Sequence, residues 1–149
     1  ADQIQGFFDI PVDHLYGSTV LAPYIRSLKL ENLAIASPDI GGSKRANSWA
    51  KFFDSGLVIC HKTRERPNEV ADMKEKGALS VRAVATHAVL SGKAYENIEK
   101  SALDEVIFTD SIPLHQECSK IKVISVADMF AETIRNVVEH RSISDHFIM

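Results

Sequence analysis

Hydrophobic and polar positions follow two different periods along this chain. Short continuous apolar runs, bounded by polar or glycine-containing turns, predict buried strands. Stretches with apolar residues at every third or fourth position predict amphipathic helices. The predicted strands are residues 33–36, 57–60, 80–86, 105–109 and 122–125, and the predicted helices are residues 18–28, 46–53, 70–76, 95–101 and 126–138.

The alternation of these elements predicts an α/β fold with a mostly parallel sheet flanked by helices. A chain of 149 residues fits one domain, and no repeat, low-complexity tract or linker divides it. Residues 1–15 show no regular period but carry several apolar side chains, so we expect a packed, irregular segment there. Ser18 is the expected N-cap of the helix that follows.

Charge and cysteine content narrow the function classes. A net charge of −3 and a pI near 6.1 argue against broad nucleic-acid binding. No apolar run approaches the roughly 18 residues of a membrane helix, and no secretory signal is present. Cys60 and Cys118 fit neither a disulfide framework nor a zinc site. We therefore expect a cytoplasmic protein that binds neither nucleic acid nor a membrane.

The turn Ser37-Pro-Asp-Ile-Gly-Gly42 joins the first predicted strand to the helix at 46–53. A Gly-Gly turn lets backbone amides approach an anion at a helix N-terminus. Asp39 would lie at the carboxyl end of the strand, and its carboxylate is a ligand type that Mg²⁺ accepts. The alternative is a tight turn whose glycines adopt positive φ and whose Asp39 caps the helix. The local pattern leaves both interpretations open.

Polar residues also follow two other predicted strands, as Thr86-His87 and Thr109-Asp110. The carboxyl ends of parallel strands lie along one edge of a sheet, so we expect these residues to converge with Asp39. Each residue has an ordinary alternative as a cap or turn former. For His87 the alternative is a hydrogen-bonded structural histidine.

Residues 61–68 form a basic segment that carries Lys62, Arg64 and Arg66. As a mobile loop it would close over a polyphosphate and stabilise charge that develops during phosphoryl or pyrophosphoryl transfer. The alternative is a solvated charge run without a function of its own. No Ser-His-Asp set, phosphate-binding P-loop or dinucleotide fingerprint is present.

With these residues laid out, nearly the whole chain resembles the C-terminal domain of ribose-phosphate pyrophosphokinases, the synthetases of phosphoribosyl pyrophosphate (PRPP). The resemblance implies a type I phosphoribosyltransferase-like domain. The family moves the β,γ-pyrophosphoryl group of ATP to the 1-hydroxyl of ribose 5-phosphate, with Mg²⁺ as cofactor. The matching segments are Asp2-Gln-Ile-Gln-Gly-Phe-Phe-Asp-Ile-Pro-Val-Asp13, Ser37-Pro-Asp-Ile-Gly-Gly42, the loop from Lys62, Ala85-Thr-His87 with Leu90-Ser-Gly92, Asp110-Ser-Ile-Pro113 and Ser142-Ile-Ser-Asp-His-Phe147.

The resemblance also implies roles for individual residues. Lys62 and Arg64 match the catalytic lysine and arginine of the family's flexible loop, and Arg64 also binds substrate. Asp39 matches a Mg²⁺ ligand. The family uses phosphate and ADP as effectors and assembles as homo-oligomers, usually hexamers built from dimers. The implied regulatory phosphate site between subunits contains Ser142, Ser144 and Phe147.

Two departures from the family pattern are as informative as the match. The chain starts where the family's C-terminal half starts, so we expect that it lacks the N-terminal domain and much of the ATP site. The ribose-phosphate loop, Val-Asp-Asp-x-x-Asp-Thr-x-Gly-Thr in the family, is missing between about residues 68 and 77. The loss amounts to one β-α unit, and a parallel sheet without a central strand has unpaired backbone groups. We therefore expect the complete protein to carry this unit, and these 149 residues alone to be inactive.

Two other functions are alternatives at this point. A non-catalytic, anion-binding subunit related to PRPP synthetases would share the fold, although it has no need for Lys62 and Arg64. A phosphoribosyltransferase that consumes PRPP is the other alternative. The run Gln-Ile-Gln-Gly-Phe-Phe and the terminal Ser-Ile-Ser do not suit that class.

Overall fold

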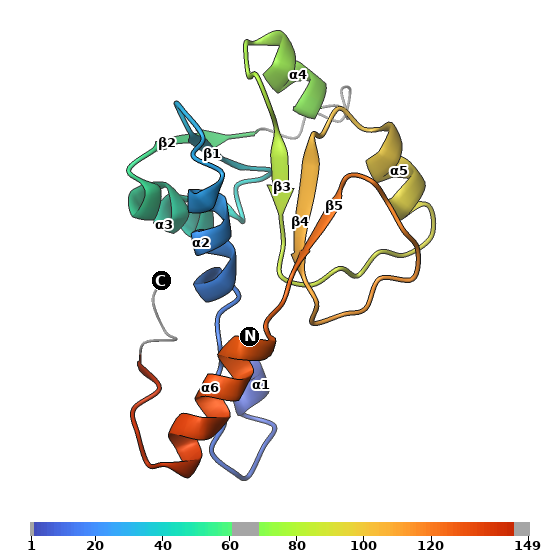
Figure 1. Cartoon of the computed structure of the whole chain (residues 1–149). Helices are drawn as coiled ribbons and strands as arrows, with labels where there is room; N and C mark the ends of the chain where they lie inside the picture. The colour runs from blue at the N-terminus through green and yellow to red at the C-terminus, as the bar shows by residue number, and fades with distance from the viewer. Residues whose placement is uncertain (1, 61–68, 145–149) are drawn as a thin grey trace.

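The computed structural model describes residues 2–60 and 69–144 (Figure 1). All five predicted strands and all five predicted helices are present, with ends that shift by up to three residues, and a short first helix was not predicted. The elements in chain order are α1 (Asp2–Gln5), α2 (Ser18–Ser27), β1 (Ala34–Ser37), α3 (Ser43–Phe53), β2 (Gly56–Ile59), α4 (Glu69–Glu75), β3 (Arg82–Val84), α5 (Ala94–Lys100), β4 (Glu105–Thr109), β5 (Ile121–Ile124) and α6 (Ala127–Val138).

Every described strand pair is parallel, which confirms the predicted α/β class. The strands are nevertheless divided between two sheets, one of order β1-β2 and one of order β3-β4-β5. The single sheet expected from the sequence is therefore interrupted between β1 and β3. The interruption arises because no strand in the described ranges pairs with both β1 and β3.

The core is centred on β4, the middle strand of the larger sheet. Its residues alternate between the two faces of the sheet, as the period of a strand requires. Val106 and Phe108 pack with Ala88 in one buried cluster, which α5 covers through Ile98. Ile107 and Thr109 belong to the opposite face and are fully buried. Four of the five residues of β4 are buried, as expected for a parallel strand that is covered on both faces.

Helix α2 connects the two sheets. Its buried face consists of Leu21, Ala22 and Ile25. The Tyr24 hydroxyl donates a hydrogen bond to Glu105 of β4 (3.0 Å), which ties the helix to the larger sheet. The Arg26 guanidinium lies 4.7 Å from the centre of the Phe52 ring on α3, which packs against β1 and β2. A cation over an aromatic face contributes about 0.5–1 kcal/mol at a partly exposed site.

The N-cap of α2 differs from the prediction. Gly17 occupies that position, with no side-chain hydrogen bond to the helix, and Ser18 is the first helical residue. Cys60 and Cys118 are both half-buried, and no disulfide joins them. Within residues 2–60 and 69–144, no helix is long and apolar enough to cross a membrane.

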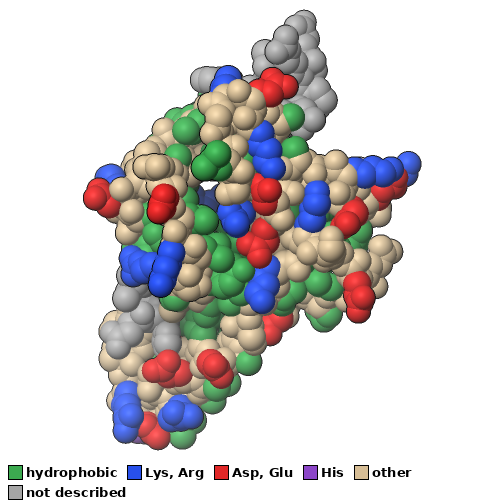
Figure 2. Space-filling model, turned by 45° about the horizontal axis from the view of Figure 1, so that its top comes forward, with side chains coloured by type: hydrophobic (Ala, Val, Ile, Leu, Met, Phe, Trp, Pro, Cys, Tyr) green, Lys and Arg blue, Asp and Glu red, His purple; other side chains and the backbone are tan. Residues whose placement is uncertain are grey.

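Large apolar side chains are exposed near the N-terminus and along α6. Phe7 is 85% exposed and Ile10 is 68% exposed, so the expectation of a packed segment at residues 1–15 is wrong. Helix α6 buries Met129 and Thr133, while its apolar residues Phe130, Ile134, Val137 and Val138 remain exposed. In Figure 2, hydrophobic side chains reach the surface at several places among the charged ones. The periodicity of the sequence correctly identified these apolar side chains, but it did not show whether other parts of this chain bury them.

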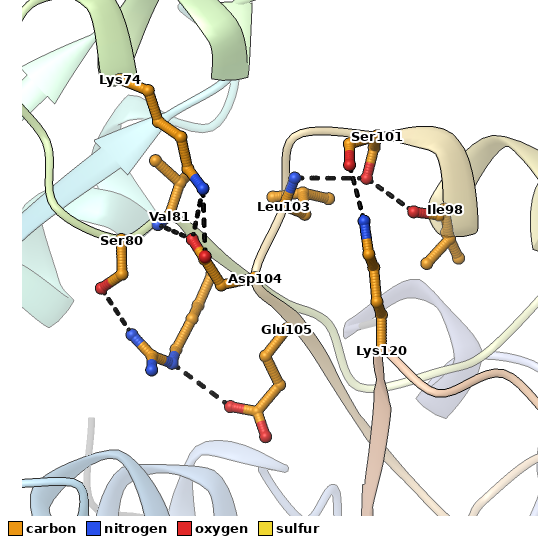
Figure 3. A network of polar contacts seen from close by, with 10 residues as sticks. Lys74, Ser80, Val81, Ile98, Ser101, Leu103, Asp104, Glu105 and Lys120 are labelled. Carbon is orange, nitrogen blue, oxygen red and sulfur yellow. Dashed lines mark hydrogen bonds and ion pairs between the residues drawn. The ribbon is translucent and has the colours of Figure 1, made fainter.

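A polar network holds α4 against the larger sheet (Figure 3). Lys74 of α4 lies 3.0 Å from the carboxylate of Asp104, and the same carboxylate accepts a hydrogen bond from the backbone N–H of Val81 (2.7 Å). Gly77, at φ +101°, follows the end of the helix, where this left-handed backbone suits glycine. The contact fixes the chain's entry into β3 beside the start of β4.

The Asp104 network predicts a specific loss of stability in acid. The Val81 N–H and then Lys74 hold the pKa of Asp104 below its ordinary value of 3.8. A carboxyl group whose pKa is lower in the folded than in the unfolded protein stabilises the fold at any pH above its unfolded pKa. This stabilisation is lost as the pH falls through the pKa of the folded protein. We therefore expect Asp104→Asn to lower the free energy of unfolding at pH 7, with a deficit that shrinks below about pH 4.

This deficit should be modest, because the Asp104 side chain is 36% exposed and solvent screens the ion pair. Urea unfolding at a series of pH values measures it. Glu75→Gln, which neutralises an exposed carboxylate on α4 next to Lys74, is the control and should show no such pH-dependent deficit. A deficit for Asp104→Asn that is constant from pH 7 to pH 3 would contradict the proposed origin.

Candidate functional site

The turn after β1 is built around Asp39. β1 ends at Ser37, whose buried hydroxyl donates a hydrogen bond to the backbone carbonyl of Asp39 (2.7 Å). The Asp39 carboxylate bends back along the turn, and its Oδ1 accepts the backbone N–H of Gly42 (2.7 Å) just before α3 begins. One carboxylate oxygen therefore stabilises the turn. The Asp39 residue is exposed at the surface.

The glycines of this turn have a different role from the one expected. Gly42 has φ −81°, and neither Gly41 nor Gly42 has a positive φ, so that part of the tight-turn interpretation is wrong. Close approach explains the glycine at position 42, because an added Cβ would lie 2.7 Å from the Ser37 hydroxyl. Asp39 is not the N-cap of α3 either: Gly42 occupies that position without a side-chain cap, and Asp39 accepts the N–H of Gly42 instead. This hydrogen bond also occupies one of the amides that an anion cradle would use.

We expect Gly42→Ala to lower the free energy of unfolding by about 1–2 kcal/mol, because Ser37 is buried and must shift to admit the methyl group. Gly41→Ala is the matched control, since its Cβ would meet only Asp39 Oδ1 at 3.4 Å. Urea unfolding of both variants measures the difference. Equal stability of the two variants would show that the Ser37 contact does not restrict position 42.

The carboxyl ends of β3 and β4 form a second group of polar residues. The Thr109 hydroxyl is fully buried and donates to the backbone carbonyl of Thr86 (2.7 Å). The Ser111 hydroxyl lies 2.7 Å from Nδ1 of His87 and 2.8 Å from the Thr109 hydroxyl. These contacts join the ends of neighbouring strands, as the sequence predicted. They also give His87 and Thr109 structural roles, since both side chains hold the strand ends together.

Asp110 turns away from this group. Its Oδ1 accepts the backbone N–H of Val126 at the N-terminus of α6 (2.9 Å). The hydroxyl of Ser125 and then the Val126 N–H hold the pKa of Asp110 below its ordinary value. A carboxylate at a helix N-terminus is stabilised by the unpaired amides and by the helix dipole. The capping interpretation therefore accounts for Asp110.

The expected convergence of three strand ends is confirmed only in part. The structure joins Thr86-His87 to Thr109 through Ser111. Among the described residues, no hydrogen bond connects Asp39 with this group, and β1 belongs to the other sheet. The two parts of the candidate site lie at the ends of β1 and β3, the two strands between which the sheet is interrupted.

Several candidate residues fall outside the described residues. Lys62 and Arg64 lie in 61–68, and Phe147 lies in 145–149. Ser142 and Ser144 are described and exposed, and their hydroxyls lie 2.7 Å apart. The Ser144 N–H also donates to the Ser142 hydroxyl (3.2 Å), so the two serines form a local turn after α6.

The described residues fit a Mg²⁺ ion only as a site with one protein carboxylate. No group of three or more His, Cys, Asp or Glu side chains in the described ranges is arranged to hold a metal. Mg²⁺ commonly takes one or two protein carboxylates and completes its shell with water and substrate phosphates. Asp39 satisfies that requirement, with one oxygen engaged in the turn and an exposed side chain.

Two positions of this region were not identified from the sequence. Ser111 links His87 to Thr109, and its signal was its place directly after a strand end. Gly17 allows α2 to approach the end of β3, because a Cβ there would lie 2.8 Å from Thr86 Cγ2. No local sequence pattern indicates this role of Gly17, because its contact with Thr86 joins residues that are far apart in the chain.

Comparisons with known proteins agree with this architecture. A curated ribose-phosphate pyrophosphokinase of Porphyromonas gingivalis is 49% identical over 176 aligned residues, covering 97% of this chain and 56% of the relative. One from Helicobacter pylori is 47% identical over 178 residues, covering 99% and 56%. The crystal structure of phosphoribosylpyrophosphate synthetase from Mycobacterium smegmatis superimposes with a TM-score of 0.82 at 32% identity, covering 94% of this chain and 56% of that chain.

Two features of these alignments concern length. The chain spans about half the length of these relatives. The alignments also run over more positions than the 149 residues of the chain, so the relatives carry residues within the aligned region that this chain lacks. A family profile described as the phosphoribosyl synthetase-associated domain matches residues 68–148. Because this match covers more than half of the sequence, the chain belongs to the phosphoribosyl synthetase-associated domain family.

Proposed function

We propose that this chain is the C-terminal domain of a ribose-phosphate pyrophosphokinase. In the reaction, the 1-hydroxyl oxygen of ribose 5-phosphate forms a bond to the β-phosphorus of ATP. The bond between that phosphorus and the oxygen bridging to the α-phosphorus breaks. AMP leaves, and the hydroxyl proton passes to solvent or to a base. The products are PRPP and AMP.

One observation carries this proposal. Curated relatives that match 97–99% of this chain at 47–49% identity are ribose-phosphate pyrophosphokinases. The solved PRPP synthetase with the same arrangement of elements supports it independently. The parallel strands with polar residues at their carboxyl ends are also where open α/β sheets bind ligands.

The chemistry assigned to individual residues follows from charge. Lys62 and Arg64 would stabilise the negative charge on the transferring pyrophosphoryl group, and Arg64 would also bind substrate. Asp39 would hold Mg²⁺ together with water and phosphate oxygens, and the ion would offset phosphate charge when bound. The Asp39–Gly42 hydrogen bond orients the carboxylate for this role before any ligand arrives.

We propose that these 149 residues alone do not catalyse the reaction. We propose that the active protein has a further N-terminal domain and a β-α unit between about residues 68 and 77, which carries the ribose-phosphate loop. The longer alignments with relatives support an additional segment. The test is PRPP formation from ATP and ribose 5-phosphate, assayed for the 149-residue chain and for the complete protein. Turnover by the short chain would refute the incomplete-site proposal, and inactivity of the complete protein would refute the enzyme assignment.

Asp39→Asn tests the metal role without removing the turn. The amide oxygen of asparagine still accepts the Gly42 N–H, whereas the negative charge that attracts Mg²⁺ is lost. In the complete protein we expect the Mg²⁺ concentration for half-maximal PRPP formation to rise about tenfold. Asp54→Asn, at the other end of α3, is the control for loss of an exposed carboxylate. An unchanged Mg²⁺ titration for Asp39→Asn would exclude Asp39 as a ligand.

The proposal extends to how the protein is regulated, how it assembles and where in the cell it acts. Ser142 and Ser144, together with Phe147, would form part of a phosphate or ADP site between subunits of a homo-oligomer. The exposed apolar side chains of α6 are consistent with burial in an assembly. The protein is proposed to act in the cytoplasm, where its substrates ATP and ribose 5-phosphate are present.

A further inference from the structure

His87 lies just after the carboxyl end of β3, at the edge of the sheet where open α/β folds bind their ligands. The residue is exposed, and Nδ1 of its ring lies 2.7 Å from the Ser111 hydroxyl. Within residues 2–60 and 69–144, no hydrogen bond engages the other ring nitrogen, Nε2. One ring nitrogen therefore holds the strand ends together, and the other remains available to a bound substrate.

The contacts around Ser111 determine which ring nitrogen of His87 carries the hydrogen. Three short contacts lead from the Thr86 carbonyl to the ring: carbonyl to Thr109 hydroxyl (2.7 Å), Thr109 hydroxyl to Ser111 hydroxyl (2.8 Å), and Ser111 hydroxyl to Nδ1 (2.7 Å). Each contact needs one hydrogen, the carbonyl carries none, and each hydroxyl supplies one. The third hydrogen comes from Nδ1, so this network assigns the neutral ring a hydrogen on Nδ1 and a lone pair on Nε2.

The sheet itself fixes the position of this network. Thr109 is fully buried, and its backbone N–H also donates to the Thr86 carbonyl (3.1 Å). The backbone N–H of Ser111 donates to the Thr109 hydroxyl (3.3 Å), which fixes Ser111 beside the two strand ends. The contact with Ser111 then restricts rotation of the imidazole. A catalytic group that is oriented before the substrate binds costs less entropy during the reaction.

The carboxylates at the strand ends are less suited to accept a proton. Asp110 accepts the Val126 N–H, and the hydroxyl of Ser125 and then this N–H hold the pKa of Asp110 below its ordinary value, which weakens it as a base. Asp39 accepts the Gly42 N–H and is proposed to hold Mg²⁺. Imidazole changes its charge near neutral pH and is the most frequent general acid or base in enzymes.

We infer that His87 is the general base of the reaction and that its Nε2 takes the proton of the 1-hydroxyl of ribose 5-phosphate. This inference rests on the proposed function and adds the proton acceptor to it. The hydroxyl oxygen forms its bond to the β-phosphorus of ATP, and its proton moves to Nε2. The bond from that phosphorus to the oxygen bridging to the α-phosphorus breaks, and AMP leaves with the electron pair. The imidazolium then returns its proton to solvent. Ser111 is a positioning residue, because it acts only through the ring.

His87→Asn separates the two ring nitrogens. The asparagine amide places an N–H near the position of Nδ1 and can still donate to Ser111, but it has no counterpart of Nε2. In the complete protein, we expect kcat for PRPP formation to fall about 100-fold, because a general base contributes at least about this factor. The KM for ribose 5-phosphate should change less than about threefold. His115→Asn, which alters an exposed histidine between β4 and β5, is the matched control and should keep full activity.

The ring can also be observed without altering it. We expect ¹⁵N NMR of the complete protein, at a pH where the His87 ring is neutral, to show the hydrogen on Nδ1. Ser111→Ala should mix the two tautomers and lower kcat about tenfold, because the ring loses its orienting contact.

Three results would overturn the inference. They are a neutral ring with its hydrogen on Nε2, a kcat for His87→Asn within about threefold of the unaltered protein, and a raised KM with an unchanged kcat, which would make His87 a substrate-binding residue only. The NMR result decides the matter even if His87→Asn does not fold. Inactivity of the unaltered complete protein would refute the proposed function, whereas an active protein that tolerates His87→Asn would refute this inference alone.

Discussion

Lys62→Ala is expected to lower PRPP formation by the complete protein about 1,000-fold. A cation placed against the transferring group stabilises charge in the transition state, and removing one such donor commonly costs about 10²–10³ in turnover. The number of substrate contacts is otherwise unchanged, so the loss should appear in kcat more than in the KM for ribose 5-phosphate. Steady-state kinetics with saturating Mg²⁺ measures both.

The control for this variant is Lys76→Ala, which removes an exposed lysine just after α4 and should retain full activity. Size-exclusion chromatography shows whether assembly is preserved in both variants. A loss below about tenfold for Lys62→Ala, with assembly intact, would favour the solvated charge run over the catalytic loop. The same result would reopen the alternative of a non-catalytic, anion-binding subunit.

Ile107→Ala is expected to lower the free energy of unfolding by about 3 kcal/mol, the largest effect on stability that we predict. Ile107 is fully buried in the central strand β4, so truncation removes apolar contacts and leaves a cavity. Paired strands on both sides of β4 limit how far the backbone can move to fill that cavity. Urea unfolding followed by far-UV circular dichroism measures the change.

Val123→Ala on β5 is the comparison for Ile107→Ala. Val123 lies beside Phe108 in the register of the same sheet but is 37% exposed. Its truncation should cost less than about 1 kcal/mol, because solvent already reaches the side chain. Comparable costs for the two variants would mean that β4 is not the centre of the core.

Ile107→Ala and Lys62→Ala together separate effects on stability from effects on catalytic activity. The buried side chains of β4 position the strand ends, where Thr109 and Thr86 are joined by a hydrogen bond. Lys62 belongs to a segment proposed to act on substrate. We therefore expect Ile107→Ala to unfold the protein at lower urea concentration while the folded fraction keeps its activity. Lys62→Ala should lower the activity of the folded protein and leave the urea concentration at which it unfolds unchanged.

Hydrophobic periodicity by itself was sufficient to predict most of the secondary structure. The predicted bounds of β4 agree with the structure, and α6 begins one residue later than predicted. Gly77, which has a positive φ, follows the end of α4, where glycine is a common residue type. These features depend on interactions between near neighbours, which a sequence window contains. The Asp39 turn was located for the same reason, because its two hydrogen bonds span only two and three residues.

Tertiary structure alone decided how these elements and residues meet. The division into two sheets depends on which strands are available to pair, and the contact of Gly17 with Thr86 joins residues that are distant in sequence. The exposure of Phe7 and of the apolar side of α6 likewise depends on what packs against them. A hydrophobic period reports that a residue suits a buried position, whereas burial itself requires a partner from elsewhere in the fold. The sequence therefore determined the elements and the turn at Asp39, while pairing and packing determined the open sheet and the links between strand ends.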